Sequence, residues 1–109
     1  MACDFQTVRE LGLALAGVTE STTYGSPSLK LKGKMIACIA SHKSAEPGTL
    51  VVRVGFAERD ELIAGAPAIY YVKPHYLDYP AVLARLGQIS RDELSGLLRM
   101  GWQFAGRKA

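Results

Sequence analysis

The segment from Lys73 to Leu86, KPHYLDYPAVLARL, contains His75, the histidine of the chain that is the best candidate for catalysis or ligand binding. An imidazole titrates near neutral pH, so His75 could act as a general base. It could equally contact a ligand or nucleic acid, or hydrogen-bond a loop carbonyl and hold the turn. General-base catalysis needs a nucleophile, and the nearby hydroxyl residues are Tyr76 and Tyr79. The sequence contains neither a Gly-x-Ser-x-Gly motif nor a Cys/His signature, so we expect that the protein is not an enzyme.

Metal and cofactor motifs are also missing from the sequence. A metal site needs three or four converging ligands, but His42 is distant in sequence and Asp78 is the carboxylate near His75. The two cysteines, Cys3 and Cys38, lack metal-ligand spacing, and Cys38 fits a buried free thiol. No glycine-rich phosphate-binding motif follows a strand-like segment. We therefore expect no metal and no cofactor.

Positive side chains interleaved with tyrosines form the second notable pattern. Three lysines cluster in a hairpin-like segment: Lys30, Lys32 and Lys34. Three more cations occupy later strands or their ends: Arg53, Lys73 and Arg85. The tyrosines of the connections are Tyr24, Tyr76 and Tyr79. Lysine and arginine bind phosphates, and tyrosine rings offer stacking surfaces for bases. The same lysines could instead keep a solvated sheet soluble and its edge unpaired. Tyr24 could be either a lid over the core or a site residue.

The overall composition permits nucleic-acid contact without requiring it. The chain has 109 residues and a formal net charge of +3, and we expect a single domain over residues 1–109. No apolar run approaches the roughly 18 residues that a membrane span needs. The first residues lack the basic and apolar regions of a secretory signal, so we expect a cytoplasmic protein.

Two amphipathic helices are predicted at the ends of the chain. The first begins after Asp4, a good N-cap, and runs to about Ala16 with an apolar stripe. The last begins after Ser90, which forms a capping-box pattern with Glu93. Its apolar stripe comprises Leu94, Leu97, Leu98, Trp102 and Ala105.

Between these helices the pattern changes to that of strands. We expect strands over residues 29–32, 35–40, 49–55, 68–74 and 81–87, with a tight turn at Gly33-Lys34 and a short helix over 57–67. Residues 18–28 are rich in turn formers and are expected to be an irregular connection. These elements predict an α+β fold. It is a two-layer sandwich in which an antiparallel sheet of about five strands carries the N- and C-terminal helices on one face, leaving the other face partly open.

Five segments together resemble the MmcQ/YjbR-like family of small bacterial proteins. They are VRELGLALAGVTES, YGSPSLKLKGKMIACI, LVVRVGFAERDELIAGAP, YVKPHYLDYPAVLARL and DELSGLLRMGWQFA, and the pattern PHY..YP.VL.RL is the most specific. The resemblance implies a fold like that of the iron chaperone CyaY and of DNA-binding double-wing domains. The family is often described as DNA-binding because of that likeness, while its biochemical role is largely unassigned.

The family positions that match here are Tyr24, Gly25, Pro27, Gly33, Lys34, His75, Tyr79, Pro80 and Arg85. The chain departs from iron-binding CyaY-like proteins, because its first helix offers only Asp4 and Glu10 in place of an acidic surface. Iron binding is therefore not expected.

These observations lead to one expectation and one alternative. We expect DNA binding through the open sheet face. The phosphates would be contacted by Lys30, Lys32, Lys34, Arg53 and Arg85, and the site would be shaped by Tyr24, His75 and Tyr79. The alternative is a small anionic ligand or a protein held in a cleft around His75, Tyr24 and Arg85. A pocket favours the small ligand and a flat positive face favours DNA. We expect a monomer or weak dimer.

Overall fold

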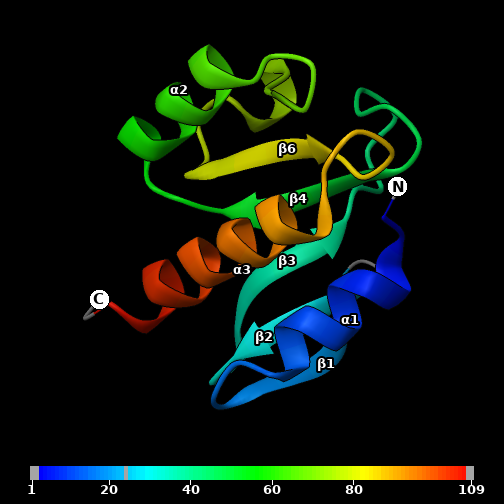
Figure 1. The fold of residues 1–109 in the computed structure, drawn as a ribbon, viewed down its shortest axis with the longest axis vertical. Coiled ribbons are helices and arrows are strands. Elements are labelled where there is room, and N and C mark those ends of the chain that lie inside the picture. The colour runs from blue at the N-terminus through cyan, green and yellow to red at the C-terminus, as the bar shows by residue number, and fades with distance from the viewer. Residues whose placement is uncertain (1–2, 24, 108–109) are drawn as a thin grey trace.

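The N-terminal and C-terminal helices lie across one face of an antiparallel sheet (Figure 1). The computed structural model describes residues 3–23 and 25–107. Its helices are α1 (Phe5–Leu13), α2 (Phe56–Gly65) and α3 (Arg91–Gly106), with a 3₁₀ turn, η1 (Pro74–Tyr76). Its strands are β1 (Val18–Thr23), β2 (Ser26–Leu31), β3 (Lys34–Ile39), β4 (Thr49–Arg53), β5 (Tyr70–Tyr71) and β6 (Ala81–Arg85).

The strand order is β1-β2-β3-β4-β6-β5, and every neighbouring pair is antiparallel. The predicted two-layer α+β sandwich is therefore confirmed, with six strands where about five were expected. The prediction of an irregular connection over residues 18–28 was wrong, because β1 pairs with β2 from Val18 to Thr23. This edge strand buries Val18 and leaves its other residues partly or fully exposed, so it lacks the apolar pattern of the inner strands. Its three threonines nevertheless favour extended backbone.

Side-chain caps fix the starts of α1 and α3. The Asp4 carboxylate accepts a hydrogen bond from the Thr7 N–H at 3.1 Å. The Ser90 hydroxyl accepts from the Glu93 N–H at 3.0 Å, and the Glu93 carboxylate accepts from the Ser90 N–H at 2.9 Å. Both predicted starts are confirmed, and α1 ends at Leu13, earlier than the sequence pattern predicted.

The hairpin between β2 and β3 turns at Lys32 and Gly33, one residue earlier than predicted. Both residues have positive φ, 52° and 81°, as a type I′ two-residue turn requires. The pairing register then shifts beyond Lys30, which opposes Met35, while Leu29 opposes Ala37. This bulge lets Met35 and Cys38 contribute to the same face of the sheet although they are three positions apart.

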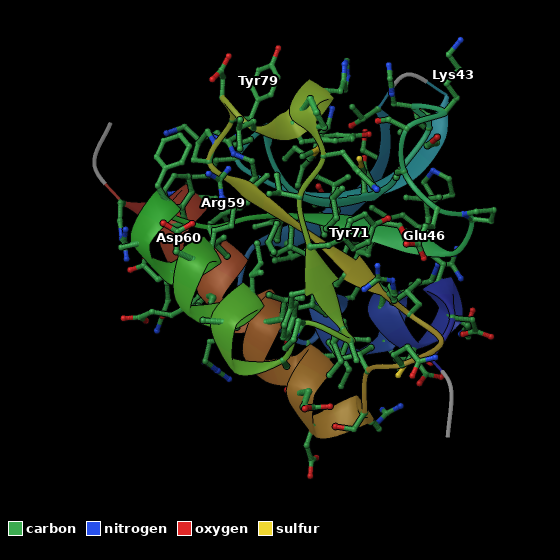
Figure 2. All side chains as sticks on the ribbon, turned by 90° about the horizontal axis from the view of Figure 1, so that it is seen from above. Lys43, Glu46, Arg59, Asp60, Tyr71 and Tyr79 are labelled. Atoms are coloured by element: carbon green, nitrogen blue, oxygen red, sulfur yellow. The ribbon has the colours of Figure 1, made fainter. Side chains whose placement is uncertain are left out.

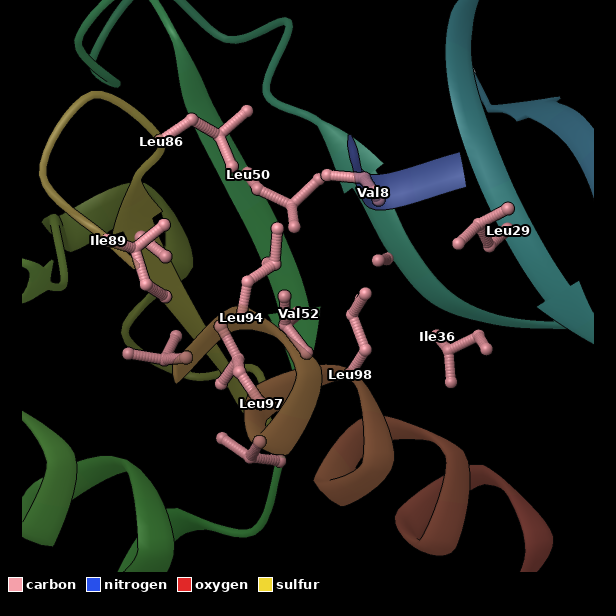
Figure 3. Close-up of a cluster of buried hydrophobic side chains, with 14 of the residues drawn as sticks. Val8, Leu29, Ile36, Leu50, Val52, Leu86, Ile89, Leu94, Leu97 and Leu98 are labelled. Carbon is pink, nitrogen blue, oxygen red and sulfur yellow. The ribbon is translucent and has the colours of Figure 1, made fainter. Parts of the chain in front are cut away.

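The main core fills the space between α1, α3 and the sheet (Figure 3). It is formed by buried aliphatic side chains that include Val8, Leu29, Ile36, Leu50, Val52, Val82, Leu94, Leu97 and Leu98. Leu62 and Ile63 of α2 pack against the same core. Trp102 is half-buried at its margin and donates its indole N–H to the Ala16 carbonyl at 2.8 Å.

The opposite face of the sheet carries a smaller apolar cluster: Cys38, Val51, Tyr71, Ala81 and Leu83. Met35, Ala40, Ala45 and Tyr76 pack against it, so the loops that follow β3 and β5 cover part of this face. The rest is open, as expected. Among the described residues, no helix has the length and apolar character needed to cross a membrane.

Candidate functional site

A pocket of about 610 Å³ lies on the sheet face opposite α1 and α3. Its floor consists of short or flexible apolar side chains from the strands, including Met35, Cys38, Val51 and Ala81. Its walls come from the two covering loops and the end of β1: Ala40, Ser41, His42, His75, Tyr76, Tyr79, Pro80 and Thr23. Arg53, at the end of β4, completes the lining.

The two histidines of the chain stack on each other at this wall. The ring centroids of His42 and His75 are 3.6 Å apart and the planes differ by 11°. Tyr76 meets both rings edge-on, with centroid distances of 6.2 Å to His42 and 4.9 Å to His75. The structure therefore joins the loop after β3 to η1 through three aromatic rings.

Hydrogen bonding assigns the protonation state of His42. Its Nδ1 accepts from the Ser44 N–H at 3.1 Å and lies 2.7 Å from the Ser44 hydroxyl. A ring nitrogen that accepts carries no proton, so we assign the neutral form with the proton on Nε2. Partial burial lowers the pKa of His42, and the neighbouring His75 and Lys43 lower it further.

Arg53 joins this pocket to a second hollow of about 630 Å³. The second hollow is lined by Gly33, Lys34, Met35, Arg53, Phe104, Ala105 and Arg107. The Arg53 guanidinium carbon lies 5.4 Å from the centroid of the Phe104 ring. Its Nε is buried and has no hydrogen-bond partner among the described residues. The Arg53 guanidinium is therefore stabilised by a cation–π contact with Phe104 rather than by an ion pair with a carboxylate.

We call the two adjoining hollows the basic groove. In the described part of the chain, no aspartate or glutamate is among the residues that line either hollow. Beside the groove, the Oε2 atom of Glu58 lies 4.0 Å from the Arg107 guanidinium. Within residues 3–23 and 25–107, no cluster of three or more His, Cys, Asp or Glu side chains could hold a metal ion. The groove therefore presents cations, aromatic rings and apolar surface to any ligand.

Arg59 of α2 holds the loop that forms one wall of the pocket, a role that was not predicted from the sequence. Only 7% of this arginine is exposed. Its guanidinium donates to the carbonyls of Leu77 and Tyr79 at 3.0 and 3.1 Å. Figure 2 shows it between α2 and the loop that carries Tyr79. The helix was predicted from Leu62 and Ile63 alone, and a buried arginine leaves no pattern in sequence because its partners are backbone carbonyls far along the chain.

Arg85 lies outside the groove and makes a dense set of internal contacts. It forms a two-pronged ion pair with Glu46, at 2.9 and 2.8 Å, and donates to the carbonyls of Pro67 and Ala68. Its guanidinium also lies 4.3 Å from the centroid of the Tyr71 ring. The hydrogen bond from Arg85 lowers the pKa of Glu46 (Figure 2 labels Glu46 and Tyr71). These contacts argue for a structural role, so the expected phosphate contact of Arg85 stays an untested prediction.

The remaining predicted site residues that the structure describes fall on or beside the groove. His75, Tyr79 and Arg53 line the pocket, and Lys34 lines the second hollow. Lys30 pairs with Met35 across β2 and β3, which places both on the same face, and Lys32 is at the hairpin turn. Tyr24 lies outside the described residues. Sequence reasoning missed the contribution of His42, which it treated as remote from His75.

Comparison with known families agrees with this architecture. A YjbR family profile matches residues 13–104. The chain belongs to the YjbR family. This YjbR-family chain also resembles a crystal structure of the Deinococcus radiodurans protein DR2400, which contains a DUF419 domain. The TM-score is 0.78 at 19% identity, over 98% of this chain and 81% of that one. At this identity the likeness shows a shared fold.

Sequence relatives among curated proteins are uncharacterized. Protein Rv2570 of Mycobacterium tuberculosis and protein Mb2600 of Mycobacterium bovis are each 44% identical to this YjbR-family chain over 47 residues. Each match covers 43% of this chain and 36% of the relative. The chain therefore matches about a third of the length of these curated relatives.

Proposed function

We propose that this YjbR-family protein binds DNA through the basic groove. The observation that carries the proposal is the position of Arg53 between two hollows whose described lining residues include no acidic side chain. A carboxylate in the lining of the groove would repel phosphates and could pair with Arg53. Its absence from the lining leaves the guanidinium charge available to an anionic ligand.

The phosphate contacts would come from residues that share this surface. Lys34, Arg53 and Arg107 line the second hollow, and Lys30 lies on the Met35 side of the sheet. Arg85 is left out because its guanidinium is already occupied by Glu46 and two backbone carbonyls. The interface is thus smaller than the one expected from sequence, and it is concave.

Fluorescence anisotropy with labelled DNA at several salt concentrations tests this function. Four neutralised phosphates give a slope in log affinity against log salt of about −3.6 for duplex and about −2.8 for single-stranded DNA. Raising salt from about 50 to 200 mM therefore weakens binding roughly 150-fold for duplex and roughly 50-fold for a single strand. Arg53→Ala and Lys34→Ala should each weaken binding and reduce the slope by about one contact. Arg91→Ala is the matched control, since Arg91 is exposed and pairs with Glu10 of α1. Absence of salt-dependent binding at micromolar protein would remove the proposal.

The volume of the pocket favours a second candidate, a small anionic ligand. About 610 Å³ falls within the range typical of small-molecule sites, and the stacked histidines give the pocket a defined wall. Titration calorimetry with free mononucleotides and aromatic carboxylates tests it. Micromolar binding of such a compound, abolished by Arg53→Ala and accompanied by no DNA binding, would favour this candidate over the first.

A further inference from the structure

We infer that the pocket receives a single unstacked nucleobase, so that the protein prefers single-stranded DNA to duplex. This inference rests on the proposed DNA binding and adds which form of DNA is bound. In a duplex each base is stacked and paired, and its faces are inaccessible unless the base is extruded at an energetic cost. A concave pocket gains contacts only from a base that is already free.

The floor of the pocket suits a flat ring. Cys38, Val51 and Ala81 are buried residues of three neighbouring strands that present small side chains in one layer. Met35 closes one end with a flexible thioether side chain that adapts to different ring shapes. Burying one face of a base on this layer removes apolar surface from water.

Aromatic side chains surround that floor. His75 and Tyr76 lie at the wall, and His75 is exposed on η1 while its ring is backed by His42. Tyr79 lines the pocket with 58% of its surface exposed, which leaves much of this large ring open to solvent. Stacking on such rings contributes about 1–3 kcal/mol per base and tolerates any sequence. Tyr79 is therefore placed to stack a neighbouring base of the same strand.

Polar groups at the rim supply hydrogen bonds and a path for the backbone. Thr23 and Ser41 line the pocket. The Thr23 hydroxyl donates to the Ser28 hydroxyl at 3.1 Å and can still accept from a base edge, whereas a serine hydroxyl such as that of Ser41 can accept or donate. Arg53 borders both hollows, so a base in the first hollow leaves its phosphate beside this guanidinium. The strand would continue past Lys34 and Arg107 in the second hollow.

The test compares a labelled oligothymidylate of about 12 nucleotides with a duplex of the same length at one salt concentration. We expect the single strand to bind at least about tenfold more tightly, which corresponds to one base stacked in the pocket. His75→Ala and Tyr79→Ala should reduce this ratio towards one. Lys34→Ala should weaken both forms by the same factor, because it contacts phosphate.

A pocket-filling variant, Ala40→Leu, gives an independent readout, and thermal melting confirms that each variant is folded. Loss of the single-strand preference in Ala40→Leu with duplex binding retained supports the inference. Equal affinity of the wild-type protein for both forms, with normal salt dependence, overturns base insertion while DNA binding stands. If neither form binds, both proposals are overturned.

Discussion

The imidazole rings of His42 and His75 lie face to face, 3.6 Å apart, although they belong to two different loops. The stack forms part of the wall of the pocket. Two imidazoles at this distance repel each other when both are charged, so the arrangement depends on at least one ring being neutral. The Ser44 N–H that donates to His42 supplies that condition.

Acid pH should weaken this wall. Burial, His75 and Lys43 lower the pKa of His42 below its ordinary value of 6.5, so its neutral form is favoured in the folded state. The stability that this provides is fully present above about pH 6.5 and is lost as the pH falls through the lowered pKa. NMR titration of the His42 ring should give a midpoint below 6.5. His75→Ala should raise that midpoint, and a wild-type midpoint at or above 6.5 would contradict the geometry.

Removing Arg59 should destabilise the protein and release the loop that carries Leu77 and Tyr79. Arg59→Met keeps much of the side-chain bulk but leaves the Leu77 and Tyr79 carbonyls without their donor. We expect a loss of about 2–4 kcal/mol in the free energy of unfolding, measured by urea denaturation. Asp60→Asn is the control, because Asp60 is exposed and lies 3.8 Å from the Arg59 Nε. It should change stability by less than about 0.5 kcal/mol.

Two glycines of α3 should respond in opposite directions to alanine. A Cβ at Gly101 would lie 3.0 Å from Val52 Cγ1 and 3.3 Å from the carbonyl oxygens of Arg53 and Ile36. We expect Gly101→Ala to cost about 1–2 kcal/mol because backbone atoms cannot yield easily. Gly96 has nothing within 4 Å of the same position, so Gly96→Ala should stabilise by about 0.5–1 kcal/mol. Equal effects in thermal unfolding would mean that α3 does not approach the sheet at Gly101.

The Arg85–Glu46 pair should contribute to stability and not to DNA binding. A double-mutant cycle with Arg85→Ala and Glu46→Gln should give a coupling of about 1 kcal/mol or less, since both side chains are partly exposed. The coupling is present above the ordinary pKa of Glu46, 4.5, and disappears as the pH falls through its lowered pKa. The salt slope of DNA binding should be the same in Arg85→Ala as in the wild type. A reduced slope in Arg85→Ala would mean that Arg85 does contact a DNA phosphate.

Local sequence signals were enough to predict much of the fold. Asp4 and Ser90 start helices through side chains within a few residues of the backbone groups they cap, so their role is visible in sequence. The alternation Leu29, Lys30, Leu31 likewise predicts a strand of a half-buried sheet. β1 was not predicted because an edge strand needs little apolar surface, and its polar residues are also typical of loops.

The candidate site depends on contacts that no local pattern contains. His42 meets His75, and Arg59 meets the Tyr79 carbonyl, only after the sheet has formed and brought separate loops together. His75, Tyr79 and Arg53 were predicted individually from their residue types, and they do line one pocket. Arg85 has the same residue type as Arg53. What separates the two is an acidic neighbour, Glu46, which comes from the distant loop before β4.

The thiol of Cys38 offers chemical access to the interior of the groove. It lies in the pocket floor with 9% of the residue exposed, and burial raises its pKa, so it reacts slowly as a free nucleophile. The other cysteine, Cys3, donates its S–H to the Ile89 carbonyl on a different surface. A disulfide-forming fragment that binds in the cavity would place its disulfide beside the Cys38 thiol, and this proximity favours capture at position 38. The natural sequence thus contains an attachment point for discovering what this groove accommodates, with no engineered residue.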